Sequence, residues 1–264
     1  MKKLLYILAS CWVYMPNAQM VQSPLVALPF LEAYSRNSPS TLAFCVNPAA
    51  LAAGKGLSAS IYGERRFMLP ELGSYKAALA LGVGQGRFGF TAGRAGDLRY
   101  RETAAGLAYA RTLGKTDLGL SFDYVHTGAL GYEALPAVAA GLGAIFHIKE
   151  TFRAGLQVAN LGPSPAVELP LTMAFGLGYD ASERLFAGCE VRKARDSPVD
   201  IRLACRYRFH QQAGASLGIS TATASFLFGT AVWLPLCRLD VMAALHPRLG
   251  ISPALMISFQ NQRP

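Results

Sequence analysis

The stretch Ile201-Arg-Leu-Ala-Cys-Arg-Tyr-Arg-Phe209 alternates strictly between two kinds of side chain. Successive residues of a β-strand point to opposite faces. One face of this segment is therefore apolar, and the other carries three arginines and Ala204. A charged residue that faces lipid near the bilayer midplane costs about 2–4 kcal/mol. The stretch predicts a strand with its apolar face towards lipid and its basic face towards an interior.

Similar two-residue periods recur along most of the chain and predict an all-β fold. We expect an antiparallel transmembrane β-barrel of about fourteen strands. The expected strands are 57–67, 75–84, 87–94, 103–113, 116–126, 138–147, 152–159, 171–179, 184–192, 200–209, 213–220, 224–233, 236–245 and 251–259.

The connections between these segments alternate in length. Every even-numbered connection is tight, as at 85–86, 114–115 and 211–212, whereas most odd-numbered ones are longer, as at 127–137 and 160–170. Short periplasmic turns and longer external loops are typical of outer-membrane barrels. This parity favours a barrel in the outer membrane of a Gram-negative bacterium over a soluble β-sandwich.

The composition is consistent with a lipid-facing surface. The 264 residues are 52% hydrophobic and 16% charged, whereas charged residues make up about 25% of ordinary soluble domains. After residue 20 no apolar run approaches the roughly 18 residues of a membrane helix. The formal net charge of +9 is dispersed among the strands, so we expect lipid headgroups as partners and no nucleic acid.

The N-terminus predicts export. Residues 1–18 have the charged start and apolar core of a signal peptide, with cleavage near Ala18. A lipidated Cys11 is the alternative. Residues 19–56 would form a lead-in and a hatch, and residues 57–264 the barrel.

The hatch is expected at 38–56, the one segment of the mature chain that reads as compact non-strand structure, after an irregular lead-in up to residue 37. Asn47 would cap a short helical turn over 48–53, with Pro48 in its first position and Gly54 after its end. A surface helix ahead of a soluble β-domain is the alternative. The hatch residues singled out are Phe44, Asn47, Pro48, Ala49 and Leu51. The inner face of the barrel offers space for them, because glycines such as Gly143 and Gly155 fall on it.

The inner face is also basic. A cluster of Arg192, Arg202, Arg206 and Arg208 would attract anions in the lumen or, alternatively, pair with Glu190, Glu64 or hatch carbonyls and fill the interior. Trp233 lies near a strand end, where the aromatic girdle of a membrane barrel occurs.

The segment Asn47-Pro-Ala-Ala-Leu-Ala52 followed by fourteen strands resembles the FadL-like outer-membrane superfamily, and its Asn-Pro-Ala-x-Leu-Ala pattern is similar to the PorV/PorQ branch associated with type IX secretion. The resemblance implies a fourteen-stranded barrel with an N-terminal hatch. FadL relatives bind hydrophobic molecules, and some release them sideways through the wall. The expected external loops of this chain are shorter than the long loops that help FadL relatives bind these molecules.

These features leave two functional hypotheses. The first is a non-enzymatic subunit or adaptor of a larger outer-membrane assembly, with other outer-membrane or secreted proteins as partners. The second is a channel for small hydrophobic molecules. The four histidines have no metal-ligand spacing, and Asp123 and His126 face opposite ways, so we expect no enzymatic activity, no metal and no cofactor.

Overall fold

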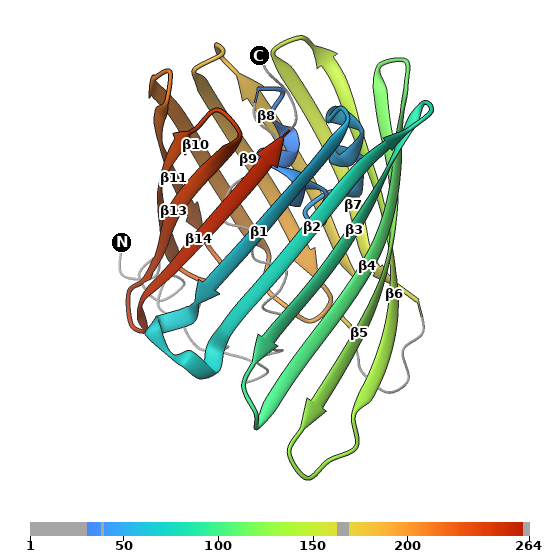
Figure 1. The fold of residues 1–264 in the computed structure, drawn as a ribbon, viewed down its shortest axis with the longest axis vertical. Helices are drawn as coiled ribbons and strands as arrows, with labels where there is room; N and C mark the ends of the chain where they lie inside the picture. Colours follow the sequence, from blue (N-terminus) through green and yellow to red (C-terminus); the bar gives the residue numbers. More distant parts are fainter. Residues whose placement is uncertain (1–30, 38–39, 163–168, 261–264) are drawn as a thin grey trace, which may run out of the picture.

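The strands form one closed antiparallel barrel in the computed structural model, which describes residues 31–37, 40–162 and 169–260. Each strand pairs with its neighbours in sequence, and β1 pairs with β14 to close the wall (Figure 1). The strands are β1 Leu57–Arg65, β2 Gly73–Val83, β3 Gly86–Gly96, β4 Tyr100–Leu113, β5 Thr116–Ala129, β6 Leu135–Lys149, β7 Phe152–Leu161, β8 Thr172–Asp180, β9 Leu185–Ala194, β10 Asp200–His210, β11 Ala213–Ser220, β12 Ser225–Trp233, β13 Cys237–His246 and β14 Gly250–Gln260. The expected all-β fold and the number of strands are confirmed.

Several strands continue beyond their expected ends. The ladder between β4 and β5 reaches the pair Tyr100 and Ala129, so the connection expected at 127–137 shortens to 130–134. By contrast, β1 ends at Arg65, and the 3-10 turn η6 (Arg66–Met68) follows. Phe67 has a φ of 52°, in the left-handed region that does not fit an extended strand.

The two faces of the wall differ as the alternation predicts. Leu203 is 42% exposed on the outer face, whereas Ala204 is 8% exposed on the inner face. Large apolar side chains such as Phe122 and Phe175 are exposed on the outside. An apolar exterior on a closed barrel is the surface of a barrel that spans a membrane through its strands. Among the described residues, no helix has the length and apolarity to cross a bilayer.

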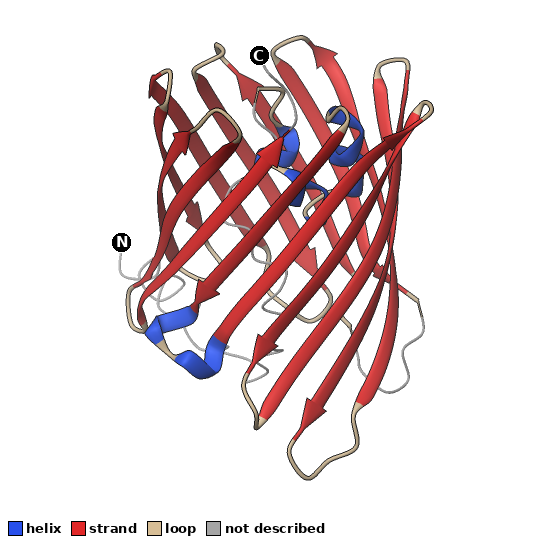
Figure 2. Cartoon of the chain, in the orientation of Figure 1, coloured by secondary structure: helices blue, strands red, loops and turns tan. Residues whose placement is uncertain are grey.

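The two ends of the barrel also differ. The tight turns β2–β3, β4–β5, β6–β7 and β10–β11 lie at the end where β14 stops, at the top of Figure 2. Gly84 and Gly114 occupy such turns with φ of 59° and 62°, where a side chain would be strained. Because short turns are periplasmic in barrels of this kind, we assign this end to the periplasm.

Three short 3-10 turns lie inside the barrel near its periplasmic end (Figure 1): η3 Glu32–Tyr34, η4 Thr41–Cys45 and η5 Pro48–Ala53. We refer to the described residues 31–37 and 40–56 as the hatch. The expected position of the hatch was partly wrong, because 31–37 was interpreted as irregular lead-in, whereas Leu31 through Ser35 are buried. The expected signal peptide, Cys11 and residues 19–30 lie outside the described residues.

Candidate functional site

The turn η5 is held against the wall by Asn47. As expected from the sequence, its side chain caps the turn, with Oδ1 accepting a hydrogen bond from the Ala49 amide at 3.0 Å. Its Nδ2 also donates to the main-chain oxygen of Leu156 in β7 at 3.1 Å. Asn47 is fully buried, so one side chain both caps the start of the helical turn and attaches the turn to the barrel.

Glycines in the wall make the space for this turn. A Cβ added at Gly143 of β6 would overlap Asn47 Oδ1, and one at Gly119 of β5 would overlap the peptide between Pro48 and Ala49. The sequence expectation that inner-face glycines leave space for a plug is confirmed at these two positions. The wall backbone therefore lies directly against the hatch, against main-chain atoms at Gly119 and side-chain atoms at Gly143, and any larger residue would displace the hatch.

The apolar side chains of η4 and η5 pack against strands on both sides of the seam between β1 and β14. Phe44 and Leu51 join a buried apolar cluster with wall residues from β1, β2, β4, β13 and β14, which are Tyr62, Ala78, Ala80, Ala108, Ala110, Met242 and Met256. Gly89 of β3 lies against both Phe44 and Leu51. All five expected hatch residues, Phe44, Asn47, Pro48, Ala49 and Leu51, are buried in contact with wall or hatch.

The turn η3 adds a second attachment that sequence reasoning missed. The ring of Tyr34 is fully buried against Gly155 and Gly176, where a Cβ would overlap it. Its hydroxyl donates to Glu190 Oε2 of β9 at 2.9 Å. Tyr34 thereby links the start of the hatch to the far side of the barrel.

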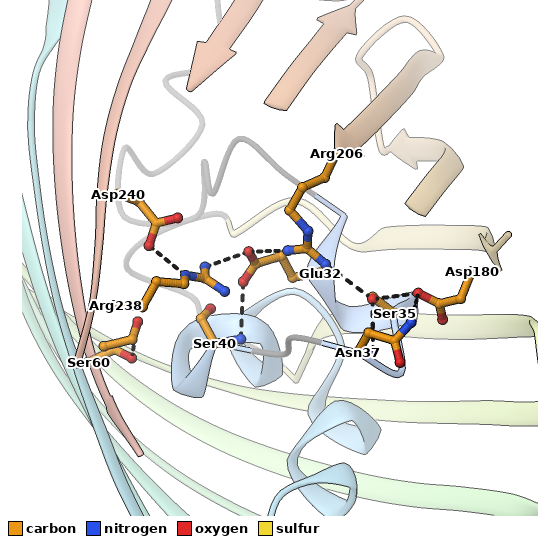
Figure 3. A network of polar contacts seen from close by, with 10 residues as sticks. Glu32, Ser35, Asn37, Ser40, Ser60, Asp180, Arg206, Arg238 and Asp240 are labelled. Atoms are coloured by element: carbon orange, nitrogen blue, oxygen red, sulfur yellow. Dashed lines mark hydrogen bonds and ion pairs between the residues drawn. The ribbon is translucent and has the colours of Figure 1, made fainter. Parts of the chain in front are cut away.

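An ion network around Glu32 fixes the same turn (Figure 3). Glu32 Oε1 accepts from Arg206 Nη1 at 2.7 Å and from Arg238 Nη2 at 2.6 Å. Its Oε2 accepts from the Ser40 amide at 3.0 Å, and Arg238 Nε donates to Asp240 at 2.7 Å. Glu32 is 7% exposed and Arg238 is 6% exposed. Charges this deeply buried are tolerated only when they are paired and hydrogen-bonded. Glu32 of the hatch therefore supplies the counter-charge for Arg206 and Arg238 of the wall.

A further link runs from the hatch to Asp180 at the end of β8. Ser35 Oγ donates to Asp180 Oδ1 at 2.9 Å, and the Arg36 amide donates to Oδ2 at 2.8 Å. Arg153 of β7 donates to the Ser35 main-chain oxygen at 3.2 Å. The hatch is thus bonded to β7, β8, β9, β10 and β13.

The four expected basic residues do not form one cluster. Arg192 and Arg202 both approach Glu190 Oε1, at 3.4 and 3.8 Å. Arg206 lies apart from them on Glu32, and Arg208 stacks over the Trp233 ring with its Cζ 5.1 Å from the ring centre. Arg202 and Arg208 are six residues apart on one strand, which separates their Cα atoms by about 20 Å. One ligand therefore cannot contact all four, and the alternative of pairing with Glu190 fits Arg192 and Arg202. The other expected partner, Glu64, lies beside Arg66 at 3.6 Å instead.

A cavity of about 220 Å³ lies next to the hatch, on the side of the longer loops. Phe44, Cys45 and Pro48 of the hatch form part of its lining. The remaining lining combines apolar residues, including Tyr100, Leu107 and Val125, with the polar residues Lys76, Glu102, Asp123, Gln157 and Arg192. Among the described residues, Gln157 Oε1 is buried without a hydrogen-bond partner. We call this space the outer cavity. Its walls can hold a small molecule that is mostly apolar and carries a polar group.

The periplasmic end contains one close histidine and carboxylate pair that was not expected. His147 Nε2 lies 2.7 Å from Asp117 Oδ2, and Thr112 Oγ1 donates to Asp117 Oδ1 at 2.6 Å. Only Asp123 and His126 were considered from the sequence, and they face opposite ways. Register explains the difference, because β5 places Asp117 beside the end of β6, a pairing between strands that alternation alone does not give.

Comparisons with known proteins identify the fold. No family profile matches the sequence, and no curated protein is similar to it. Solved structures are similar. The Ralstonia pickettii toluene transporter TbuX has a TM-score of 0.69 at 12% identity, over 91% of this chain and 100% of that one. A TodX monoaromatic hydrocarbon channel mutant gives 0.65 at 10% identity, over 84% and 95%. A Pseudomonas aeruginosa FadL homologue gives 0.60 at 10% identity, over 82% and 93%.

These neighbours share the barrel architecture described above. The chain has the fold of FadL-like outer-membrane barrels, and with its apolar exterior it is a β-barrel of the Gram-negative outer membrane. The neighbours do not test the PorV/PorQ branch expected from the six-residue motif, which stays a prediction. The neighbours named here are transporters and channels or their homologues.

Proposed function

We propose that the protein is an outer-membrane channel for a small, mostly apolar organic molecule, which enters the outer cavity and passes when the hatch moves. Of the two functions expected from the sequence, the comparisons support the channel and give no support to the adaptor. The observation that carries the proposal is the outer cavity itself, whose floor is the hatch and whose lining is apolar with a few polar groups. Pockets that bind small molecules typically have such a lining, mostly apolar with a few polar groups.

The cavity limits the size and chemistry of the cargo. Its volume of about 220 Å³ is below the range of about 300–1,000 Å³ for drug-sized ligands. Toluene and other monoaromatic hydrocarbons are the compounds named for two of the structural neighbours. Lys76, Asp123 and Gln157 in the lining favour a molecule of that size that also carries a polar group, because buried polar side chains are stabilised by hydrogen bonds.

The experiment compares two neighbouring alanines of β4. Ala104 lines the outer cavity, whereas Ala105 is exposed on the lipid face. We expect Ala104→Phe to slow uptake of p-cresol and toluene into cells at least about fivefold, while Ala105→Phe leaves it unchanged. Equal uptake by both variants, at matched amounts of folded barrel in the membrane, would contradict the proposal.

Removing the hatch tests the claim that the hatch must move for a molecule to pass. The wall is closed by its own β-ladder, so a chain lacking residues 31–53 should still insert into the membrane. We expect this deletion to conduct ions in a planar bilayer, whereas the intact protein conducts little. A deletion barrel that inserts and stays closed would mean that side chains of the wall, and not the hatch, block the pore.

A further inference from the structure

A second cavity lies on the opposite side of the hatch and opens at the periplasmic end. It encloses about 580 Å³ between the hatch, β2, β3 and the turns that follow β10 and β12. Leu51 and Thr41 of the hatch line it, together with Trp233, Leu234 and Pro235. We call it the periplasmic cavity. The hatch separates it from the outer cavity.

The charges that line the periplasmic cavity are all positive. They are Arg36, Lys55, Arg87 and Arg208, and none of the described residues in the lining is an aspartate or glutamate. Arg36 lies 3.7 Å from Glu150 at the surface, which leaves Lys55, Arg87 and Arg208 to set the potential inside. A cleft lined by one sign of charge between low-dielectric walls concentrates ions of the opposite sign.

Two polar atoms in the lining have no partner. Arg87 donates through Nη2 to the Gly56 main-chain oxygen and to Ser58 Oγ, both at 3.1 Å. Among the described residues, Arg87 Nε and Thr41 Oγ1 are buried without a hydrogen bond. Arg87 is 6% exposed and Thr41 is 7% exposed. Buried polar groups are nearly always satisfied by protein, water or ligand, so these two atoms leave hydrogen-bonding capacity unused beside the cavity, on its hatch side and its wall side, although neither atom is itself accessible from it.

An aromatic face lies beside the cations. The Arg208 guanidinium stacks over Trp233, and its Nη2 donates only a long hydrogen bond of 3.4 Å to the Glu183 main-chain oxygen. The remaining N–H groups of this guanidinium form a planar fork, which matches a carboxylate or phosphate. The ring, Leu234 and Pro235 provide apolar surface next to that fork.

We propose that the periplasmic cavity is a binding site for a small organic anion, with its carboxylate or phosphate between Arg208 and Lys55 and its apolar body against Trp233. Such a ligand combines the two features of the lining, its uniform positive charge and its apolar wall. The site is formed by a different cavity from that of the cargo, so this proposal stands independently of transport.

Trp233 allows the site to be tested directly in the full-length protein. The sequence has two tryptophans, Trp12 and Trp233, so a Trp12→Phe background leaves one fluorophore, which lines the cavity. We expect 4-nitrobenzoate to quench it saturably at low salt. The neutral 4-nitrobenzamide should bind at least about tenfold more weakly, and added sodium chloride should weaken the binding of the benzoate.

A matched pair of double variants assigns the effect to the cavity. We expect Lys55→Gln with Arg208→Gln to weaken 4-nitrobenzoate binding at least about tenfold, because hydrogen bonds between charged partners are the strong ones. Lys115→Gln with Arg111→Gln removes the same charge from exposed positions of the same end that lie outside the lining, and should change binding less than twofold. Migration of unheated protein on a gel confirms that both variants are folded.

The proposal is overturned if benzoate and benzamide bind equally, or if the two double variants weaken binding by the same factor. Absence of saturable quenching in the folded parent protein would overturn it as well. Each of these results leaves the transport experiments unaffected, so the two proposals can fail separately.

Discussion

Replacing Glu32 by glutamine should release the hatch while the barrel stays intact. One oxygen of Glu32 accepts hydrogen bonds from two buried guanidiniums, at 2.7 and 2.6 Å, and the other accepts from the Ser40 amide at 3.0 Å. Glutamine retains one acceptor oxygen and adds an NH₂ group, which must face either the arginines or the Ser40 N–H. Two donors then point at each other, and two buried cations lose their shared counter-charge.

The size of the effect follows from the partners that remain. Breaking a buried ion pair by removing one member costs about 3–5 kcal/mol. Arg238 keeps Asp240, and Arg206 keeps its bond to Ser35, so the lower end of that range applies. A loss of about 3 kcal/mol corresponds to a change of roughly 100-fold in the equilibrium between docked and undocked hatch. The strands make their own ladder, so the barrel should not unfold.

Hydrogen exchange measures this local opening. We expect the amides of residues 41–53 to exchange up to about 100-fold faster in Glu32→Gln, with the exchange of β4 and β5 unchanged and a higher open probability in a planar bilayer. Glu71→Gln removes a carboxylate from the exposed turn η7 (Pro70–Leu72) and serves as the control. Equal exchange of 41–53 in both variants would refute the reasoning, because the ion network would then not hold the hatch.

Three further outcomes are expected. Leu203→Arg should lower the amount of assembled barrel, because an arginine facing lipid costs about 2–4 kcal/mol, whereas Ala204→Arg should assemble with a displaced hatch; heat-modifiable migration of membrane extracts distinguishes them, and the reverse order would mean that the register is wrong. Gly143→Val should raise bilayer conductance because its side chain overlaps Asn47, while Ala144→Val on the neighbouring, opposite-facing position should not; equal conductance would contradict the close contact. Burial alone would raise the pKa of Glu32, a hatch residue outside the membrane-spanning strands, but Arg238 and Arg206 lower it by more, so the pKa lies below its ordinary value of 4.5. The carboxylate therefore contributes fully above pH 4.5 and loses its contribution only as the pH falls through the lowered value, so conductance should stay low from pH 7 to 4.5 and rise only at lower pH; a rise already at pH 6 would exclude Glu32 as its cause.

Local patterns were sufficient to predict the wall. The alternation of apolar and polar side chains predicted the strands and the direction in which each side chain points, as at Leu203 and Ala204. It does so because every second residue of a strand must be apolar where one face of the sheet contacts lipid. The cap at Asn47 was also predictable, since Asn followed by Pro is a local signal for a helical start. These features depend on residues that are close in sequence.

The attachments of the hatch could not be predicted in this way. Glu32 and Arg238 are separated by 206 positions, and nothing in the sequence around Glu32 indicates which strand it meets. The expected girdle position of Trp233 was wrong for a related reason. The prediction rested only on the nearness of Trp233 to a strand end. In β12, Val232 is exposed on the outer face, so Trp233 faces inward. Its ring lies near Arg238, whose Cζ is 6.0 Å from the ring centre.

The ion pair between Glu32 and Arg238 also bears on how the barrel closes during folding. The ladder that closes the wall joins β1 to β14, as in the pair Ser58 and Gln260, and closing a loop of roughly 200 residues is entropically unfavourable and slow. A chain in which Glu32 has already met Arg238 has only about 50 residues left in the two segments between that contact and the seam. By loop-closure scaling this lowers the entropic cost by roughly 1 kcal/mol. The segment that lies inside the finished barrel would then act earlier as a template that brings the two ends of the wall together.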